Sequence, residues 1–545
     1  MSKTSLATPS TNSGLSNEPG QGRTRKGSAF WLCFLALLVA AFLSALDLSA
    51  IPTALPTIIN ELHGGDKFVW VGSAYGLSSA AVLILAGRLA DIWGRKPVML
   101  ASIALFCLGS ILAGSARNMD MLIAARVIQG MGGGPIVAVS QIITSDLVSL
   151  AERGVYQGII VLVWALAAGI GPVVGGALAE VSCQWRWLFY LNIPLTVLAF
   201  VLVTIFLRVR TPEGSARSKL MRVDWLGNAL VAVGATLALL GLTWGGIQYP
   251  WSSVHVLVPL ILGFVFITVF FVYEVYVPGE PTMPLDILAN RTSFSGYLST
   301  FVHGIISISA IYYLPVYFQA CLGTSALQSS VNFLPVALVI APFAVVAGLV
   351  VKAMNRYRPL NIAGWIISIV GFGLMSLLKA DSPPARWIPF QLVMSVGTGI
   401  IYTSTVFPIL APLPVSRNAA ALAFFVFCRT FSQTWGITIA GTILQNQLKA
   451  RLPHAFASRF SSGVEIAYAS IPLIHDLPEP LRTEVRAAFA TSMSVIWKTM
   501  AGLCGVGIVT LFFMKEVPMV KHTDETYGLQ EKAAVVAPTK SLQNV

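Results

Sequence analysis

Two side chains of opposite charge lie inside long apolar stretches and are the strongest candidates for chemistry. Asp47 belongs to the stretch of residues 30–55, and Arg126 belongs to the stretch of residues 121–142. If both stretches cross a bilayer as helices in opposite directions, a rise of about 1.5 Å per residue places the two charges at similar depth. An ionisable group at that depth is costly without a partner. We therefore expect one polar cluster in which Asp47 takes up and releases a proton; the alternative is a purely structural ion pair.

The elements that must hold this pair are membrane-spanning helices. The chain has 545 residues, of which 56% are hydrophobic and only 11% are charged, whereas a soluble domain is about 25% charged. A chain this long and apolar cannot bury its apolar surface in a single hydrophobic core, because such cores stop growing at about 250–300 residues. This composition excludes a water-soluble enzyme, a disordered scaffold and a collagen-like fibre, and it leaves the bilayer as the solvent.

Apolar stretches long enough to cross a bilayer recur along the chain. We predict about fourteen of them, since each spanning helix needs roughly 20 apolar residues. A basic segment from Arg208 to Arg222 follows the first six, and two more precede the last block, so the grouping is six, two and six. We therefore expect an all-α membrane protein with two six-helix bundles and two linking helices. The predicted spans are residues 30–55, 69–87, 98–115, 121–142, 156–179, 187–207, 225–245, 254–276, 295–318, 331–351, 361–379, 387–411, 420–443 and 491–514.

The same grouping sets the expected domain bounds. Both ends of the chain are polar, and we interpret them as disordered tails. The bounds are 1–28 for the first tail, 29–207 for the N-terminal bundle, 208–285 for the basic segment with the linking helices, 286–516 for the C-terminal bundle with a long outer loop at about 445–490, and 517–545 for the second tail.

The positive charges indicate which side of the membrane each loop faces. The net charge is +12, and Lys and Arg concentrate in alternate short loops. That pattern is typical of cytoplasmic loops facing anionic lipid, not of a surface that binds nucleic acid. We expect both termini in the cytoplasm and a multi-pass protein of the plasma membrane, with the vacuolar membrane as the alternative.

The loop between the second and third predicted spans carries a recognisable motif. Residues 87–96 read Gly-Arg-Leu-Ala-Asp-Ile-Trp-Gly-Arg-Lys, which resembles the G-x-L-A-D-x-x-G-R-K loop of the major facilitator superfamily. Its glycines permit close helix approach and a tight turn, and its aspartate can pair with the arginine four residues later. The resemblance implies a charge cluster that holds one state of a rocking transporter closed on the cytoplasmic side. The residues of this predicted switch loop are Gly87, Asp91, Gly94, Arg95 and Lys96.

Four further segments resemble motifs of that superfamily, and all but the one that begins at Arg126 resemble its antiporters. The sequence from Leu46 to Pro56 resembles the L-D-x-(5–7)-A-L-P signature, and the one that begins at Arg126 resembles R-V-x-Q-G-x-G. Residues 185–194 resemble the W-R-W-x-F-x-x-N-x-P segment of the drug:proton antiporter branch with fourteen spans. The fifth span carries the G-P-x-x-G-G motif associated with antiporters, whose residues here are Gly171, Pro172, Gly175 and Gly176.

Other residues are weaker candidates for contact with a cargo. Aromatic side chains of the spans are candidates to line a central cavity; they are Trp164, Tyr313 and Tyr317. Arg429 is expected to be the deepest charge, and it either contacts an anionic substrate or a carbonyl-lined cavity or, as we favour, has a structural role. Cys183 and Cys321 fall in predicted outer loops, and we expect two unpaired thiols, with a bridge as the alternative. No phosphate-binding loop, metal-ligand spacing or nucleophile elbow occurs in the sequence. We therefore expect no ATP, no metal, no cofactor and no enzyme activity.

The resemblance is strongest to fungal efflux transporters, which often export toxins or secondary metabolites. It implies a monomeric secondary transporter that exports a small amphipathic molecule, such as a drug, toxin or secondary metabolite, by proton antiport with alternating access. One alternative is a dedicated transporter of an iron chelate, an organic acid or a glycolipid on the same fold. Another is a membrane sensor that transports nothing.

Overall fold

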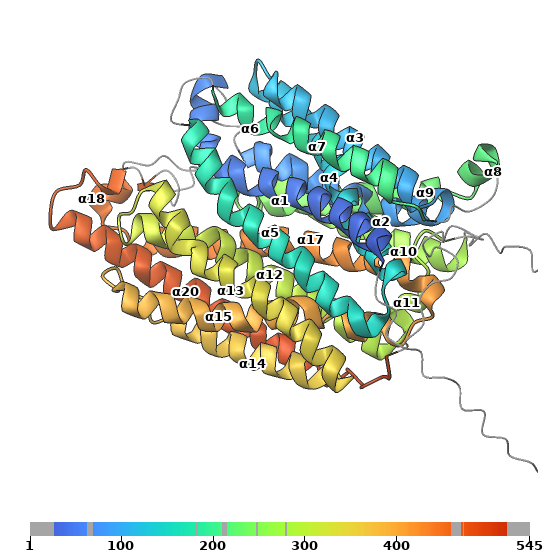
Figure 1. The fold of residues 1–545 in the computed structure, drawn as a ribbon. Helices are drawn as coiled ribbons and strands as arrows, with labels where there is room; N and C mark the ends of the chain where they lie inside the picture. Colours follow the sequence, from blue (N-terminus) through green and yellow to red (C-terminus); the bar gives the residue numbers. More distant parts are fainter. Residues whose placement is uncertain are drawn as a thin grey trace, which may run out of the picture.

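The computed structural model describes residues 27–62, 69–179, 184–209, 215–246, 249–277, 281–458, 470–471 and 473–519. Within these ranges the regular structure is helical, and the chain forms no β-sheet there. Long helices run side by side along one axis (Figure 1). The start of α1 and the end of α20 lie at the same end of this bundle as the short helices α8 and α11. We call it the α8 end.

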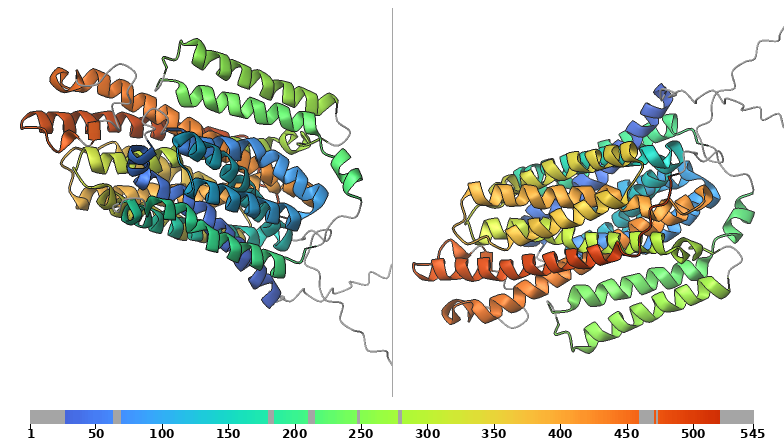
Figure 2. Two further views of the ribbon diagram at one scale, coloured as in Figure 1. Left: turned by 90° about the horizontal axis from the view of Figure 1, so that it is seen from above. Right: turned by 90° about the horizontal axis from the view of Figure 1, so that it is seen from below.

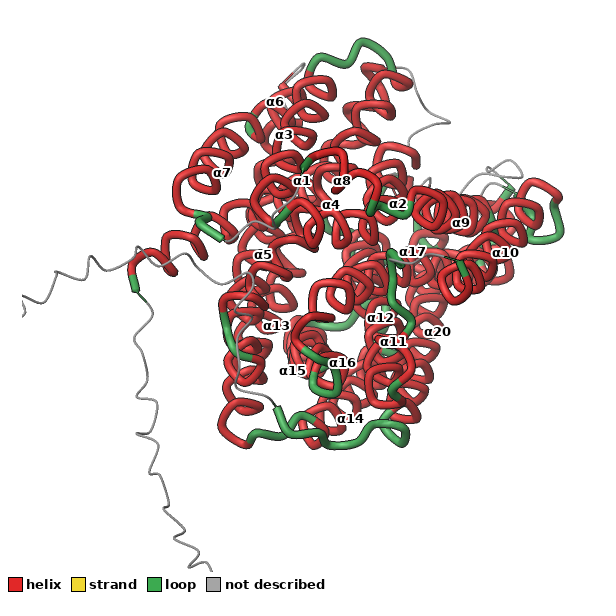
Figure 3. The backbone as a smooth tube through the Cα atoms, turned by 90° about the vertical axis from the view of Figure 1, so that its right-hand side faces the viewer, coloured by secondary structure: helices red, strands yellow, loops and turns green. Residues whose placement is uncertain are grey.

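The first half of the bundle is built from the N-terminal helices. Figure 3, which looks approximately along the helices, shows them gathered on one side of the molecule. They are α1 (Ser28–Leu62), α2 (Val69–Trp93), α3 (Arg95–Gly114), α4 (Met119–Leu147), α5 (Leu150–Ala179), the 3-10 turn η1 (Gln184–Arg186), α6 (Trp187–Tyr190) and α7 (Asn192–Phe206).

The second half gathers on the opposite side, and a helical pair lies beside both halves. The second half consists of α11 (Asp286–Ala289), α12 (Arg291–Ala320), α13 (Ala326–Met354), α14 (Arg358–Met375), α15 (Pro384–Ser404), α16 (Val406–Leu410), η2 (Val415–Arg417), α17 (Asn418–Arg451), α18 (His454–Ala457) and α20 (Leu481–Thr510). Figure 2 shows the pair α9 (Trp225–Trp244) and α10 (Val254–Tyr276) on the flank of the bundle, and α8 (Ala216–Met221) precedes it.

The described helices account for the predicted spans. Thirteen of them are long and apolar enough to cross a membrane. The predicted span at 420–443 forms the middle of α17, a helix of 34 residues that is too polar to be counted on composition alone. The connection between α17 and α20 covers residues 452–480, against the expected 445–490, because both helices continue past the ends of their apolar stretches. Most of the two predicted tails lies outside the described residues.

Two predicted spans are each split into two helices, and a proline explains both breaks. Proline has no N–H to donate to the carbonyl four residues earlier. Pro194 therefore leaves the Tyr190 carbonyl without its helical donor, and α6 ends at Tyr190. Pro408 likewise frees the carbonyl of Ser404, where α15 ends, and this carbonyl accepts a hydrogen bond of 3.2 Å from Asn361 Nδ2.

Candidate functional site

A buried ion pair joins α1 to α4 in the first half. Arg126 Nη1 lies 2.6 Å from Asp47 Oδ2, and each side chain is only 1% exposed. The structure thus brings together the two charges that their depths in the sequence placed at one level. A pair so well shielded from solvent interacts strongly, because no water screens the two charges.

Two amide side chains complete the coordination of Asp47. Asp47 Oδ1 accepts hydrogen bonds from Gln129 Nε2 at 2.8 Å and from Asn192 Nδ2 at 2.9 Å. Gln129 is held in this orientation because its Oε1 accepts from Arg126 Nη1 at 2.5 Å and its Nε2 also reaches Ser110 Oγ at 3.0 Å. An ionised carboxylate accepts hydrogen bonds and donates none, so donors on both oxygens match a deprotonated Asp47 in this conformation.

Sequence reasoning did not select Gln129 or Asn192 as site residues, although both lie in the motifs quoted above. Asn192 reaches Asp47 because it is the first residue of α7, directly after the break that Pro194 causes. Gln129 lies one helical turn after Arg126 and therefore shares its face of α4. The signal available in the sequence was a polar amide within an otherwise apolar span.

The guanidinium of Arg126 is also fixed from α2. Its Nε donates to the Val71 carbonyl at 3.0 Å, and its carbon lies 4.6 Å from the centre of the Tyr75 ring. The Tyr75 hydroxyl lies 3.1 Å from Ser44 Oγ on α1. Arg126 therefore has partners on α1, α2 and α4, and a change in its bond to Asp47 alters the contacts among all three helices.

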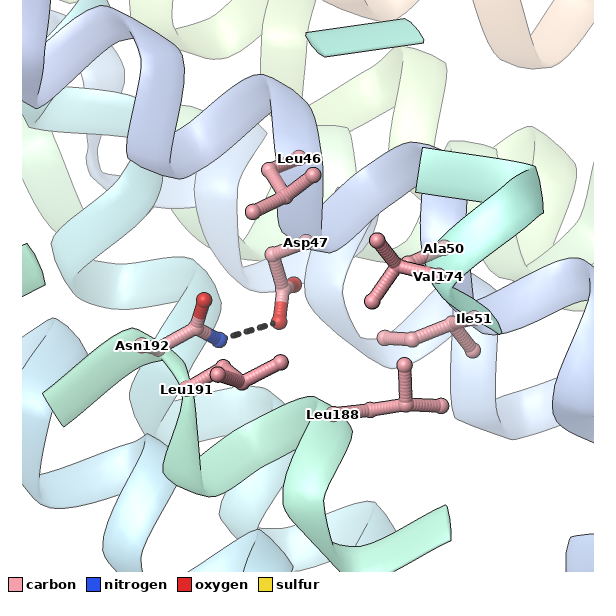
Figure 4. Close-up of a pocket in the computed structure, with 8 residues that line it drawn as sticks. All are labelled: Leu46, Asp47, Ala50, Ile51, Val174, Leu188, Leu191 and Asn192. Atoms are coloured by element: carbon pink, nitrogen blue, oxygen red, sulfur yellow. Dashed lines mark hydrogen bonds between the residues drawn. The ribbon is translucent and has the colours of Figure 1, made fainter. Parts of the chain in front are cut away.

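A small cavity reaches Asp47 from the side of α5 and α6. It has room for about one water molecule. Figure 4 shows Asp47 and Asn192 as its polar residues, surrounded by apolar side chains. The full lining is Leu46, Asp47, Ala50, Ile51, Val174, Leu188, Leu191 and Asn192. The carboxylate thus borders a space that one water molecule fits.

The predicted antiporter motif on α5 borders this cavity and packs on α1. A Cβ on Gly171 would lie 2.0 Å from Ser49 Oγ, so a larger residue cannot fit there. One turn earlier, Ser49 Oγ donates to the Ala167 carbonyl at 3.1 Å. Val174, which lines the cavity, lies between the glycines of the motif. Pro172, Gly175 and Gly176 follow in the same helix, and Gly171 is the residue of the motif that packs directly on α1.

The predicted switch loop forms a one-residue turn between α2 and α3. Gly94 has φ 97°, a conformation that favours glycine, and it is the residue between the two helices. Arg95 Nη1 donates to the Ala90 carbonyl near the end of α2 at 2.9 Å, and the Gly94 N–H donates to the same carbonyl at 3.1 Å. Lys96 Nζ donates to the Thr204 carbonyl of α7 at 2.6 Å. The turn is therefore tied to α7 as well as to α2.

Arg95 carries two carboxylate partners. Its Nη1 lies 3.0 Å from Asp91 Oδ1, as the sequence predicted, and its Nε lies 2.8 Å from Asp146 Oδ2. The Arg95 and Asp146 side chains are each 2% exposed, whereas Asp91 is 22% exposed. The sequence analysis missed Asp146, because it lies near the end of α4, far from the motif along the chain.

The two halves touch at the α8 end along two helix crossings. A Cβ on Gly87 of α2 would lie 2.3 Å from Ala423 Cβ of α17, and one on Gly348 of α13 would lie 2.2 Å from the carbonyl carbon of Gly154 of α5. Between the same two helices, Lys352 Nζ lies 2.9 Å from Glu152 Oε1. Both side chains of this pair are about a third exposed, so it contributes little to stability. The two halves are therefore in direct contact at the α8 end through these glycines.

Gly76 shows that α2 and α17 separate away from the α8 end. Gly76 precedes Gly87 by about three helical turns and so lies on nearly the same face of α2. Nothing lies within 4 Å of a Cβ built on Gly76, whereas the same construction on Gly87 meets Ala423. On this face of α2, the close contact with α17 at Gly87 is thus absent at Gly76.

The candidate cavity residues are dispersed in this conformation. Tyr313 and Tyr317 are buried within the second half, where their hydroxyls donate to the carbonyls of Ile437 at 2.9 Å and of Lys379 at 2.8 Å. Trp164 packs on a small cluster of α1 and α5 in the first half. Arg429 lies on α17 and contacts Tyr402. Their role in holding a cargo stays a prediction.

The cysteine prediction is tested in part. Cys321 is a free thiol, and Cys183 lies outside the described residues. Burial raises the pKa of the Cys321 thiol well above its ordinary value, which keeps it protonated and unreactive. Among the described residues, no group of three or more His, Cys, Asp or Glu side chains is arranged to hold a metal ion.

Asp146→Asn is expected to destabilise the protein. Arg95 would stay buried with only the half-shielded Asp91 as a carboxylate partner. Breaking a buried pair costs about 3–5 kcal/mol, and we expect the lower end of this range because Asp91 remains. Thermal unfolding of the purified variant measures the effect, with the exposed Asp381→Asn as a control that removes the same charge. An unfolding midpoint equal to that of the control would contradict the prediction.

Comparison with known sequences identifies relatives over nearly the whole chain. The family description "Major Facilitator Superfamily" matches residues 37–437. An efflux pump named FUS6 from Gibberella moniliformis is 37% identical over 96% of this chain and 94% of its own. An MFS-type transporter of the acurin A biosynthesis cluster of Aspergillus aculeatus is 37% identical over 93% of each chain. The MFS-type efflux pump MMF1 of Pseudozyma antarctica is 36% identical over 97% of this chain and 98% of its own.

Solved structures share the fold at low sequence identity. The human organic anion transporter MFSD10 superimposes with a TM-score of 0.58 at 14% identity, covering 89% of this chain and 100% of its own. The proton:xylose symporter XylE gives a TM-score of 0.59 at 13% identity, covering 91% of this chain and 98% of its own. These likenesses concern the arrangement of helices alone.

Proposed function

The chain belongs to the major facilitator superfamily, and on that basis we propose that it exports a small amphipathic molecule in exchange for protons that move inward. Membership makes it an integral multi-pass membrane transporter and not an enzyme. The names of its relatives, efflux pumps and a transporter of a biosynthesis cluster, support export of a secondary metabolite. The protein acts as a monomer without ATP.

The observation that carries the proposal is the surrounding of Asp47. Its carboxylate is sealed from bulk solvent, paired with Arg126, and bordered by a cavity for about one water molecule. A proton that reaches Asp47 removes the charge that Arg126 pairs with, so the α1–α4 contact differs between the two protonation states. Antiport requires that proton and cargo each weaken the other's binding. A change in the α1–α4 contact is therefore a physical means of linking proton binding to cargo binding.

The contacts between the halves support alternating access. The α8 end is closed at Gly87 and Gly154, while α2 and α17 separate toward the other end. We assign the α8 end to the cytoplasm, because α8 and the residue after it carry the basic side chains of Arg217, Lys219 and Arg222. The conformation is then closed toward the cytoplasm, and the Arg95 cluster holds the switch loop in place. Both termini are cytoplasmic, and the protein resides in the plasma membrane.

The glycine motif on α5 has a role in the same scheme. Gly171 lets α5 lie directly on α1 beside Asp47, and Pro172 leaves one carbonyl of α5 without its helical donor. A bend of α5 at this position widens or closes the water-sized cavity. The motif thus controls when a proton reaches the carboxylate.

Flux measurements test the proposal. Extracellular metabolites are compared between cells with and without the gene, and the compound that depends on the gene is then loaded into vesicles that contain the purified protein. We expect transport against the compound's own gradient when a proton gradient is imposed, and only downhill flux after a protonophore is added. Flux in the opposite direction would favour a dedicated importer. Absence of any flux would favour a sensor.

A further inference from the structure

Arg429, a buried arginine of the second half, lacks the kind of partner that Arg126 has. It lies on α17 and is 8% exposed. Its Nη2 donates to the Tyr402 carbonyl at 3.1 Å, and its carbon lies 3.9 Å from the centre of the Tyr402 ring and 4.5 Å from that of Phe425. Its Nε is buried and makes no hydrogen bond. Within the described part of the chain, no Asp or Glu lies within ion-pair distance of this guanidinium.

A buried guanidinium without an opposite charge beside it is energetically costly. A charge within a membrane span normally pairs with an opposite charge or lines an aqueous pathway. Arg126 follows this rule, since it has Asp47 at 2.6 Å. Cation–π attraction to the rings of Tyr402 and Phe425 recovers a part of this cost for Arg429. The rest of the cost is unexplained by contacts within the protein.

The neighbouring polar atoms are also short of partners. His303 of α12 lies with its ring 5.9 Å from that of Tyr402, and its Nε2 lies 3.1 Å from the Thr398 carbonyl. A carbonyl only accepts, so Nε2 carries the hydrogen, and Nδ1 of the neutral ring is an acceptor. This Nδ1 is buried and unpartnered. So is Ser395 Oγ, about one turn before Thr398 on α15.

Unpaired polar atoms of Arg429 on α17 and His303 on α12 thus lie beside Tyr402, with Ser395 about two turns before it on α15. Buried polar groups in folded proteins are nearly always hydrogen-bonded, and a cluster of exceptions calls for a missing ligand, water or ion. Helices α12, α15 and α17 all belong to the second half of the bundle, opposite the half that holds Asp47 (Figure 3). The cluster is therefore separate from the proton site proposed above.

We propose that Arg429 binds the carboxylate of an amphipathic organic acid that is the cargo, an inference that rests on the proposed transport function. The guanidinium offers its Nε–H to a carboxylate oxygen. The rings of Tyr402 and Phe425 contact the apolar part of the acid beside the carboxylate. His303 Nδ1 accepts from a hydroxyl or N–H group adjacent to the carboxylate. A bound carboxylate also supplies the counter-charge that Arg429 lacks in this structure.

Three aromatic acids and their neutral amides test this site on the full-length purified protein. The probes are benzoate, salicylate and 1-naphthoate, each compared with its amide at constant ionic strength. We expect the carboxylates to raise the thermal unfolding midpoint of the wild-type protein in a saturable manner, and the amides to have no such effect. Arg429→Met should weaken carboxylate binding about tenfold or more, since a hydrogen bond to a charged group contributes about 1.5–3 kcal/mol. Arg429→Lys should retain a part of the binding.

Arg386→Met is the matched control, because it removes the same side chain and charge from an exposed position on α15. This variant should bind the carboxylates as the wild type does. Stability without ligand provides a second readout. Removal of an unpaired buried charge should leave Arg429→Met at least as stable as Arg386→Met, whereas a structural role for Arg429 would make it less stable.

Two results would overturn the inference. One is that no carboxylate stabilises the wild type, and the other is that Arg429→Met responds as strongly as Arg386→Met. The vesicle assay described above separates this failure from a failure of the proposed function. Proton-driven export by the wild type without carboxylate binding refutes the anion site alone. Absence of flux for the gene-dependent compound refutes the transport proposal.

Discussion

Asp47→Asn is expected to abolish proton-driven export while it leaves downhill flux of the cargo measurable. Asparagine has nearly the same size and can still bond to Gln129 and Asn192, but it cannot take up a proton at neutral pH. The vesicles should therefore fail to accumulate cargo against its gradient at any imposed pH difference. Leaving Arg126 unpaired lowers the free energy of unfolding by about 3–5 kcal/mol. Because this cost applies to both conformations of the transporter, downhill flux should stay within about tenfold of the wild type.

The control variants separate coupling from stability. Asp381→Asn removes an exposed carboxylate and should leave uphill transport unchanged. The double variant Asp47→Asn/Arg126→Gln removes both charges of the pair. It should regain part of the thermal stability that Asp47→Asn loses, since a neutral pair leaves no unpaired charge, and it should still lack uphill transport. Accumulation at the wild-type rate in Asp47→Asn vesicles would show that another group carries the proton.

Gly154→Val is expected to reduce export by roughly 10–100-fold through a shift between conformations. A Cβ at Gly154 would lie 2.7 Å from Gly348 Cα, so a valine cannot fit while α5 and α13 touch. Overpacking of this kind costs about 1–3 kcal/mol, and the cost applies only to the state that is closed at the α8 end. The population therefore moves toward the state that is open there.

Cross-linking measures this shift directly. Cysteines that replace Glu152 and Lys352, whose side chains meet across the α5–α13 contact, should be joined readily by a short bifunctional thiol reagent in an otherwise wild-type chain and only poorly in the presence of Gly154→Val. Gly502→Val on α20 is the control, since nothing lies within 4 Å of a Cβ built there. Equal cross-linking with both valines would mean that the α5–α13 contact does not limit closure.

The sequence predicts the main helices and the central ion pair for a simple reason. Each span is marked by about 20 apolar residues, and a charge inside such a span is rare enough that Asp47 and Arg126 stand out as partners. Their depth then follows from helical rise alone. The glycine at position 94 likewise marks a turn, because its positive φ is a local property of the backbone.

Other parts of the site depend on how distant helices pack, which no local pattern encodes. Asp146 reaches Arg95 because the end of α4 lies against the turn between α2 and α3. The contact of Asn192 with Asp47 requires both the break before α7 and the packing of α7 on α1. The depth of Arg429 could be predicted from its span, but the absence of a carboxylate partner among the described residues depends on how α12, α15 and α17 pack around it.

The helix pair α9 and α10 has a mechanical consequence for such a transporter. α9 packs on α2 of the first half and on α17 of the second half. It is also linked to the second half by a hydrogen bond of 3.4 Å from Thr438 Oγ1 to the Leu242 carbonyl. If the halves tilt against each other, α9 must slide along at least one of these two neighbours. The contacts of α9 with both halves therefore limit the angle through which the halves can tilt and the rate at which they return.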